Sequence, residues 1–505
     1  MMARSRYPTW LALPALALAI GCTATQAPRS APPPQAFDPS LLARANGLPK
    51  RPDDLPKPDS IRFTPPETYT TVLSNGIKLY VLENHELPLV NVDVLVGNGF
   101  RCDPPDRPGV ASFTASVMRR GGSVRVPGDV LDDTLDFLAT SISVGMEGEA
   151  AAANLNVLRK DFATGLSFFA DVLMDPGFPQ AKLDETKRLT RESIRRRDDD
   201  PYEIARRKFR QVVYGATSPF ARQLEFADVD RITRDDLVAF HRTWFRPNIT
   251  YMAVSGDIGT DEAVAMVRDA FAAWQPGPVP DVVLPPTDDG MRPGVYIYPK
   301  DVTQAAIRMG WVGMPRHSPD EYAVDVLNQI YGQDTFTSRL GTEVRSNRGL
   351  AYYVFGVVLS DPDPRQGMFV AAAGTRVDKT YETIGVMRQV TAGMSRQPIS
   401  DEEMATAKDA IVNSFVFQYD SPAKIVGQQM RLAFEGYPPD YLKTYIGHIR
   451  AVTKLQVLSA ARKYLDADSL RTFVVGAPAM FDRPLDAYGP VTVLRPDTTG
   501  QAASP

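Results

Sequence analysis

Histidine and cysteine, the side chains that most often bind zinc, are scarce in this chain of 505 residues. Its histidines are widely separated along the sequence: His85, His241, His317 and His448. No two of them lie one helical turn apart, so no local pair can face the same metal ion. Ligands from distant segments can still converge in a fold. The pattern therefore excludes a local zinc motif, and we read His85, in a turn before a strand, as a surface residue.

Two serines, Ser112 and Ser116, lie one helical turn apart in a segment with a helical pattern. A serine nucleophile needs an adjacent base that takes its proton. Residues 109–118 (GVASFTASVM) contain neither a histidine nor an acidic residue. Hydrolysis by either serine on its own is therefore disfavoured.

The first 22 residues have the pattern of a secretory signal, with Arg4 and Arg6 ahead of a short apolar stretch at 10–20. Small residues before Cys22 are similar to the bacterial lipobox, in which the thiol is acylated and becomes the new N-terminus. The alternative is an ordinary cleaved signal with a chance cysteine. Because Thr23 follows in place of aspartate, we expect a lipid anchor in the bacterial outer membrane, facing the periplasm.

The composition excludes several classes of protein. The net charge is −4 and the isoelectric point is about 5.8, without a concentrated basic face, so we expect no nucleic-acid partner. No apolar run approaches the roughly 18 residues of a membrane-spanning helix. With Cys22 acylated, Cys102 is the only other cysteine, so no disulfide within the chain can form. A single thiol also cannot supply a zinc site.

Residues 23–66 are rich in proline, alanine, serine and charge, and such a segment is typical of a tether between lipid and folded protein. Folded structure is expected from residue 67. Asn75-Gly76 between two β-prone runs predicts a hairpin. The expected strands are 70–73, 77–82 and 89–96. The expected helices are Gly109–Arg119, Asp129–Thr140, Leu155–Met174 and Gln180–Asp198.

An internal repeat organises the rest of the chain. Residues 232–257 and 452–477 align without a gap at a spacing of 220, and each copy has the pattern of a capped helix followed by a strand that ends in glycine. The aligned pairs include Thr233 with Thr453, Trp244 with Tyr464, Val254 with Val474 and Gly256 with Gly476, and upstream Pro201 corresponds to Pro422. We therefore predict an α+β protein with homologous domains at 67–280 and 291–487, a proline-rich linker at 281–290 and a tail at 488–505.

This organisation resembles the M16 (insulinase/pitrilysin-like) peptidases from about residue 68 to 485. Residues 73–79 (LSNGIKL) look like the opening hairpin of that family, and 96–111 look like the approach to its active-site helix. In the second half, 336–352 (FTSRLGTEVRSNRGLAY) match a recurrent C-terminal signature. The resemblance implies two tandem α/β-sandwich domains of the M16 metallopeptidase type.

The zinc motif of the resembling family is lost in this chain. Catalytic members carry His-x-x-Glu-His, in which the histidines bind zinc and the glutamate takes a proton from metal-bound water. Here Ser112 and Ser116 stand at the metal positions and Ala115 at the base position. Neutral hydroxyls are poor zinc ligands, and a methyl group accepts no proton. We therefore expect a pseudoenzyme that has no zinc of its own and is inactive alone.

The third zinc ligand of catalytic relatives is a glutamate that follows the second histidine much later in the chain. Glu192 follows Ser116 at the spacing that the family shows and is interpreted as a relic of that ligand. The alternative is a solvated charge that pairs with its neighbours, because Glu192 lies in an arginine-rich helical pattern. No metal role is expected for it.

Arg345 and Tyr352 preserve a different feature of the family. In large M16 peptidases, an arginine and a tyrosine seven residues apart contact substrate near the scissile carbonyl, and these two residues have that spacing within the matching signature. A guanidinium and a phenol are suitable donors to a carbonyl that gains negative charge. The alternative is that Arg345 pairs with a carboxylate and Tyr352 packs in the sheet.

The lost zinc motif beside a retained donor pair is similar to the zinc-free subunits of bacterial M16 proteins and of the mitochondrial processing peptidase. That resemblance implies a heterodimer with a zinc-bearing M16 homologue, in which this chain holds an extended peptide or unfolded protein. The alternative is a zinc-free scaffold lipoprotein of an envelope complex, with no effect on proteolysis. A neighbouring gene for an intact homologue would favour the first reading.

Overall fold

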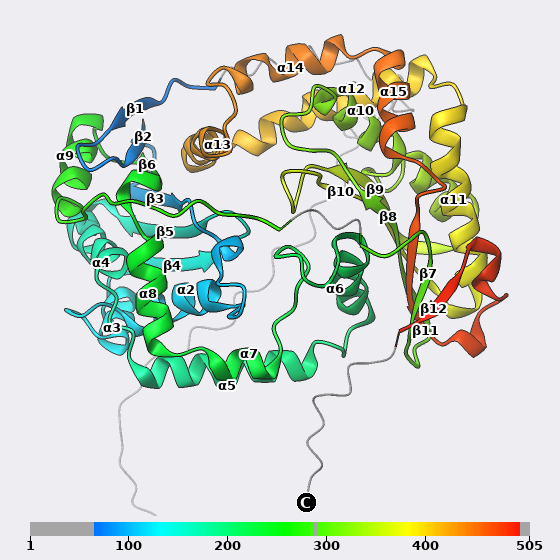
Figure 1. Cartoon of the computed structure of the whole chain (residues 1–505). Helices are drawn as coiled ribbons and strands as arrows, with labels where there is room; N and C mark the ends of the chain where they lie inside the picture. The colour runs from blue at the N-terminus through cyan, green and yellow to red at the C-terminus, as the bar shows by residue number, and fades with distance from the viewer. Residues whose placement is uncertain (1–64, 286–289, 495–505) are drawn as a thin grey trace, which may run out of the picture. The chain divides into compact units, whose positions relative to one another are not determined.

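The computed structural model describes residues 65–285 and 290–494 (Figure 1). The predicted signal with Cys22, nearly all of the predicted tether and the end of the predicted tail lie outside these ranges. The strands are β1 (Tyr69–Val72), β2 (Lys78–Glu83), β3 (Leu89–Val96), β4 (Ser141–Met146), β5 (Ala151–Leu158), β6 (Thr250–Gly256), β7 (Gly294–Pro299), β8 (Gln304–Val312), β9 (Ala351–Leu359), β10 (Met368–Arg376), β11 (Arg471–Gly476) and β12 (Val491–Val493).

Both halves of the described chain also contain helices. They are α2 (Val110–Gly121), α3 (Gly128–Phe137), α4 (Phe162–Met174), α5 (Gln180–Arg196), α6 (Pro201–Tyr214), α7 (Phe226–Arg231), α8 (Arg234–Trp244), α9 (Thr260–Ala270), α10 (Glu321–Tyr331), α11 (Thr380–Arg396), α12 (Asp401–Phe415), α13 (Pro422–Phe434), α14 (Tyr441–Ala451) and α15 (Lys454–Tyr464).

The strands form two sheets of the same topology. The orders are β1-β2-β6-β3-β5-β4 and β12-β7-β11-β8-β10-β9, with six strands in each. The second half therefore repeats five strands of the first, from β2 to β6, in the same order, as the sequence repeat predicted. The edge strands β1 and β12 differ, since β1 pairs antiparallel with β2 and β12 pairs parallel with β7.

The pairing of strands shows that the repeat also relates single residues of the two sheets. In the first sheet, Ala253 of β6 pairs with Asp93 of β3. In the second sheet, Phe473 of β11, which the sequence repeat aligns with Ala253, pairs with Arg308 of β8. Asp93 and Arg308 therefore occupy equivalent places in the two sheets.

The aligned helices α8 and α15 begin with the same capping arrangement. The Thr233 hydroxyl accepts a hydrogen bond from the backbone N–H of Asp236, and the Thr453 hydroxyl accepts one from Gln456. In both helices the N3 side chain bonds back to the cap residue, which satisfies donors that a helix start leaves unpaired. The sequence signal for these helix starts is therefore confirmed.

One face of each sheet packs against helices of its own half. In the first half, Val92 and Leu155 from the sheet join Phe169 of α4 in a buried core. In the second half, Ile307 of β8 packs in a separate core with residues of α10, α11 and α15. Each half thus has its own hydrophobic core, as expected of a repeated domain.

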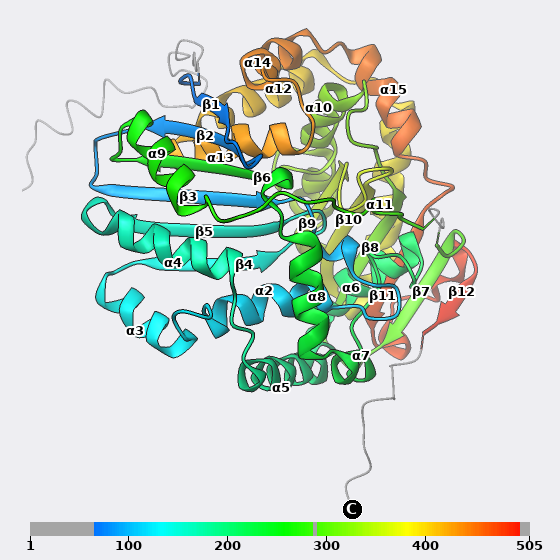
Figure 2. The same cartoon turned by 60° about the vertical axis from the view of Figure 1, so that its left-hand side comes forward.

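The opposite faces are covered by exchanged helices. Helix α6 belongs to the first half but packs on β8 and β11, where Phe209 lies in one cluster with Phe473. Helix α13 belongs to the second half but packs on β2 and β6, where Met430 clusters with Ala253 (Figures 1 and 2). The proline at the first position of each helix, Pro201 or Pro422, is the pair already related by the repeat.

One expected helix is wrong in its first part. The segment Leu155–Met174 was expected to be one helix, but β5 runs to Leu158 and α4 begins at Phe162. Burial alternates residue by residue along β5, which is the period of a strand with one face in the core. The short alanine-rich start concealed this alternation. The ordered structure also reaches further than expected, since β12 lies within the predicted tail.

None of the helices in the described residues combines the length and apolar character needed to cross a membrane.

Candidate functional site

Helix α2 carries the degenerate zinc motif and is held firmly at its start. Gly109 precedes it with a left-handed backbone (φ 95°), and the Asp103 carboxylate accepts hydrogen bonds from the N–H groups of Gly109 and Ala111, both at 2.7 Å. Arg222 donates to the same carboxylate at 3.2 Å. Burial raises the pKa of Asp103, whereas these hydrogen bonds and Arg222 lower it. Sequence reasoning missed Asp103, because it lies seven residues before the helix.

The three motif positions lie on α2 as the resemblance implied, but their chemistry is inert. Ser112 is exposed and Ser116 is partly exposed, so both point away from the core. Ala115 is only 1% exposed and packs inside the first half. Two hydroxyls and a methyl group leave α2 without a strong metal ligand or a base.

Glu192 lies on α5, which packs against α2. An ion pair between Arg120 and Glu185 at 3.1 Å joins the two helices, and Glu192 follows about two turns further along α5. Its carboxylate pairs with Arg196 at 2.7 Å and with Arg195 at 3.5 Å. Glu192 is therefore engaged by its own helix. The described part of the chain contains no group of three or more histidine, cysteine, aspartate or glutamate residues placed to hold a metal ion.

The histidines have local roles, and of the four only His241 lies on a helix, α8, that packs against α2. His85 bonds to Asp257 and Glu83, His317 bonds to the Glu435 carbonyl, and His448 stacks on Tyr322. Burial lowers the pKa of His241 to about 4, and its ring bonds to the Leu173 carbonyl at 2.9 Å.

Cys102 is buried next to the start of α2. Its thiol donates to the Asn98 carbonyl at 2.7 Å, and burial raises the pKa of the thiol to about 12. Cys102 is therefore a packed thiol with little thiolate character at neutral pH.

Arg345 and Tyr352 do lie together, on helix η5 (Gly341–Asn347) and strand β9. The guanidinium carbon of Arg345 is 4.6 Å from the centre of the Tyr352 ring and 4.4 Å from the centre of the Phe336 ring. Tyr352 is 85% exposed and Phe336 is 63% exposed. The expected alternative, Arg345 paired with a carboxylate and Tyr352 packed in the sheet, is not what the structure shows: Tyr352 belongs to β9 but its side chain is exposed, and Arg345 forms no ion pair with any carboxylate among the described residues.

Both sheets present an edge strand beside these residues. Strand β4 is the edge of the first sheet and packs against α2, and β9 is the edge of the second sheet. The later part of β9 is already bonded on its outer side, since the Gly356 N–H donates to the Gly332 carbonyl and Val358 exchanges hydrogen bonds with the Asn328 side chain. Only the part of β9 before Gly356, which includes Tyr352, is left as an open edge. An edge strand offers free N–H and C=O groups to an extended peptide. The degenerate helix and the Arg345–Tyr352 pair therefore each accompany a strand edge that can extend its sheet.

A partly buried ion-pair cluster joins the two halves. Glu149 of the first half pairs with Arg101 at 2.6 Å and with Arg316 of the second half at 2.7 Å. Arg316 also reaches Asp361 at 3.2 Å. No local spacing in the sequence signals this cluster, because its members lie far apart along the chain.

Two repeated six-stranded sheets and a degenerate motif on α2 define a protein with a zinc-peptidase fold and no zinc ligands in its motif. A model of the insulinase family, peptidase family M16, matches residues 79–220, and a model of the peptidase M16 inactive domain matches residues 231–411. The chain belongs to peptidase family M16.

Individual relatives agree with this assignment. The chain is 22% identical over 353 residues to YmxG of Bacillus subtilis, described as an uncharacterized zinc protease, over 69% of this chain and 83% of the relative. The structure of a peptidase M16 inactive domain from Pseudomonas fluorescens matches with a TM-score of 0.74 and 25% identity, over 83% of this chain and 100% of that chain. The periplasmic protease PqqL of Escherichia coli matches with a TM-score of 0.69 and 14% identity, over 83% of this chain and 47% of that chain.

Proposed function

We propose that this chain is the non-catalytic subunit of a heteromeric M16 peptidase, in which it holds extended peptide opposite a zinc-bearing homologue. The observation that carries this proposal is the state of Arg345. Its guanidinium contacts two exposed rings, Phe336 and Tyr352, and forms no ion pair with a carboxylate of the described residues. Such a group can donate to a peptide carbonyl without first breaking an ion pair.

The substrate class follows from the strand edges. An extended peptide or unfolded protein adds to β4, or to β9 before Gly356, through main-chain hydrogen bonds, which are independent of sequence. On β9 this places the peptide backbone next to Tyr352. The chemistry of bond cleavage then has to come from the partner, because Ser112, Ala115 and Ser116 supply neither a metal ligand nor a base.

The site of action in this proposal is the periplasmic side of a bacterial outer membrane, with acylated Cys22 as the anchor. Support comes from the lipobox-like end of the signal segment and from the structural likeness to a protease described as periplasmic. Growth with labelled palmitate, followed by purification of the chain and of its Cys22→Ser variant, tests the anchor. Label on the variant would contradict it.

The experiment for the function itself is reconstitution with a zinc-bearing M16 homologue from the same genome, measured with a quenched fluorescent peptide. We expect the chain to stimulate hydrolysis and the Arg345→Ala variant to lose most of that stimulation. Arg348→Ala is the matched control, because Arg348 is exposed three residues further on and pairs with Glu343 at 3.6 Å. Stable association without stimulation would favour the scaffold alternative.

A further inference from the structure

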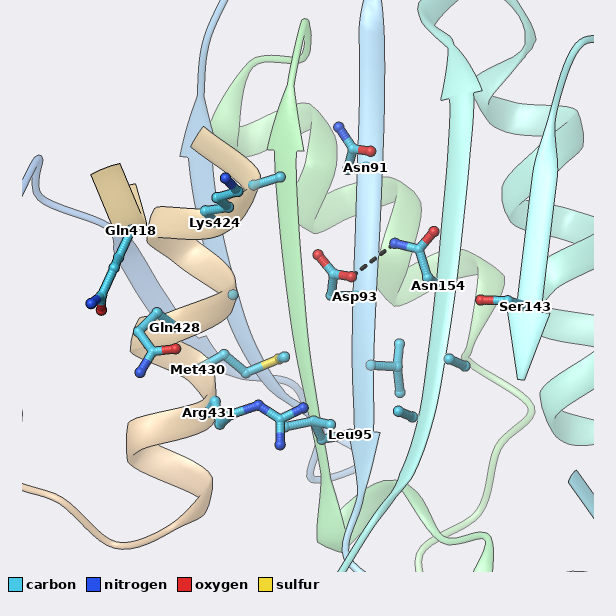
Figure 3. Close-up of a pocket in the computed structure, with 15 residues that line it drawn as sticks. Asn91, Asp93, Leu95, Ser143, Asn154, Gln418, Lys424, Gln428, Met430 and Arg431 are labelled. Atoms are coloured by element: carbon cyan, nitrogen blue, oxygen red, sulfur yellow. Dashed lines mark hydrogen bonds between the residues drawn. The ribbon is translucent and has the colours of Figure 1, made fainter. Parts of the chain in front are cut away.

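Helix α13, which covers the first sheet, carries an arginine, Arg431, with carboxylates close to it. Arg431 pairs with Glu147 at 3.1 Å. Next to it, Asp93 on β3 accepts a hydrogen bond from the Asn154 amide at 2.8 Å, in a groove of about 480 Å³ beneath α13 (Figure 3). Burial raises the pKa of Asp93, and the positive charge of Arg431 lowers it. In the first sheet, the arginine of the exchanged helix thus faces carboxylates.

The second sheet has the same arrangement of helix and strands, but the residue at the position of Asp93 carries the opposite charge. Helix α6 takes the place of α13, and Arg210 is related to Arg431 by the same spacing that relates Pro201 to Pro422. The place of Asp93 is taken by Arg308, as the pairing with Phe473 establishes. Two arginines therefore stand where the first sheet has an arginine and an aspartate.

Contacts at both ends of α6 bring the two arginines close. The Tyr202 hydroxyl donates to the Gln304 side chain at 3.1 Å, and the Tyr214 hydroxyl donates to the Gly367 carbonyl near the far end of β8. From Tyr202, eight helical residues advance about 12 Å and reach Arg210. From Gln304, four strand residues advance about 13 Å and reach Arg308. The two side chains thus come level with each other at the interface of α6 and β8.

Neither Arg210 nor Arg308 has an ion pair or a hydrogen bond with any residue that the structure describes. The other arginines lining the cavity of about 260 Å³ beside Arg210 each have a carboxylate partner: Arg197 with Glu225, Arg206 with Glu203, Arg207 with Asp198 and Arg222 with Asp103. Arg210 and Arg308 are both partly buried, and burial lowers the pKa of both guanidinium groups. Like charges withdrawn from water without a bonded counter-ion are unfavourable.

We propose that Arg210 and Arg308 form a binding site for an oxyanion, which supplies the negative charge that Asp93 supplies in the first half. A planar guanidinium binds a carboxylate or a phosphate through two parallel hydrogen bonds, so both chemistries fit. The oxyanion comes either from an acidic side chain of a bound peptide or from free inorganic phosphate. This site does not rest on the proposed peptidase partnership, since it requires only the chain itself.

Calorimetric titration of the purified full chain tests the proposal with three probes: inorganic phosphate and two peptides that differ only by glutamate or glutamine at one position. Arg308→Asp reproduces the aspartate–arginine arrangement of the first half, so we expect it to fold and to bind phosphate about tenfold more weakly or worse. Arg210→Met, which keeps an apolar stem, is expected to weaken binding similarly. Arg188→Asp, at an exposed position on α5, is the matched control and should bind like wild type.

The outcomes separate the two sources. A preference for the glutamate peptide that disappears in Arg308→Asp assigns the site to a peptide carboxylate. Equal affinity for both peptides, together with phosphate binding that needs Arg210 and Arg308, assigns it to free oxyanions. Wild-type chain that binds neither phosphate nor the glutamate peptide more tightly than Arg308→Asp would overturn the proposal. Failure of the partner assay leaves this titration unchanged, so the two proposals fail separately.

Discussion

The Arg345 guanidinium stacks on the Tyr352 ring at 4.6 Å, and no carboxylate among the described residues neutralises its charge. The two residues come from different elements, η5 and β9, so the contact depends on the fold of the second half. The centre of the Phe336 ring also lies 4.4 Å from the guanidinium carbon. An arginine fixed in this way has its N–H groups oriented before a ligand arrives, which reduces the entropy lost on binding.

Replacing Tyr352 should weaken peptide binding without changing the stability of the fold. Because Tyr352 is exposed, Tyr352→Leu should change the free energy of unfolding by less than about 0.5 kcal/mol. Loss of the cation–π contact releases Arg345 and should weaken peptide affinity about fivefold, or about 1 kcal/mol. Fluorescence anisotropy with a labelled peptide and urea unfolding measure the two effects. Phe417→Leu, at another exposed aromatic side chain, is the control, and equal loss of affinity in both variants would argue against the site.

Restoring histidines tests whether α2 keeps the geometry of the family. Ser112→His with Ser116→His places two imidazoles one turn apart, near Glu192 on the packed helix α5. We expect this double variant to bind zinc at least about tenfold more tightly than Ser112→His alone, since a second ligand adds more than about 1.4 kcal/mol. It should remain unable to hydrolyse peptide, because Ala115 offers no base. Equal zinc affinity of the two variants would mean that the serines do not face a common point.

The exchanged helices predict that a first-half mutation weakens the second sheet. Phe209 on α6 is fully buried against β8 and β11, so Phe209→Ala should lower the free energy of unfolding by about 3–5 kcal/mol. Hydrogen exchange should accelerate in β8 and β11 first. Lys208→Ala, beside it on the same helix, should leave these strands much less affected. If hydrogen exchange became faster only in β1–β6, the packing of α6 on the second sheet would be contradicted.

A buried carboxyl gives stability a defined pH dependence. Burial, helped by the charge of Glu321, raises the pKa of Asp325 to about 6 from its ordinary value of 3.8. The folded state therefore favours the protonated carboxyl, and this stabilisation is complete below about pH 4 and is lost as the pH rises through 6.

Asp325→Asn removes that dependence and keeps an oxygen that accepts from the Tyr445 hydroxyl, now 2.7 Å from the carboxylate. The free energy of unfolding of this variant, taken relative to that of wild type, should rise by about 2 kcal/mol from pH 4.5 to pH 7.5. Urea unfolding at the two pH values measures this change. Asp409→Asn, at an exposed position of α12, should show no such gain. A difference that does not change with pH would contradict a raised pKa.

The sequence predicted the architecture because its signals are local or repeated. Thr233 and Thr453 at a spacing of 220 located equivalent helix starts, and Asn75-Gly76 located the first hairpin. The segment from Leu155 was misread because a short run of alanines precedes its alternation. The sheet that a helix covers could not be predicted, since the apolar pattern of α6 predicts a buried face but does not say which sheet buries it.

Some residues of the candidate site could also be predicted from the sequence, and others could not. Ser112, Ala115 and Ser116 follow from motif spacing alone, and the contact between Arg345 and Tyr352 agrees with their seven-residue spacing. Phe336 and Asp103 were missed, because their roles depend on how separate turns fold back. The unpaired state of Arg210 and Arg308 is also invisible in sequence, since it depends on which carboxylates lie near them in space.

Zinc content of the purified chain, after dialysis against trace zinc, tests the central claim most directly. Ser112, Ala115 and Ser116 offer zinc neither a strong ligand nor a base, and the proposed function therefore assigns catalysis to a partner. The expected result is zinc well below one equivalent per chain by mass spectrometry. About one tightly bound zinc ion per chain, retained against a chelator, would contradict the account.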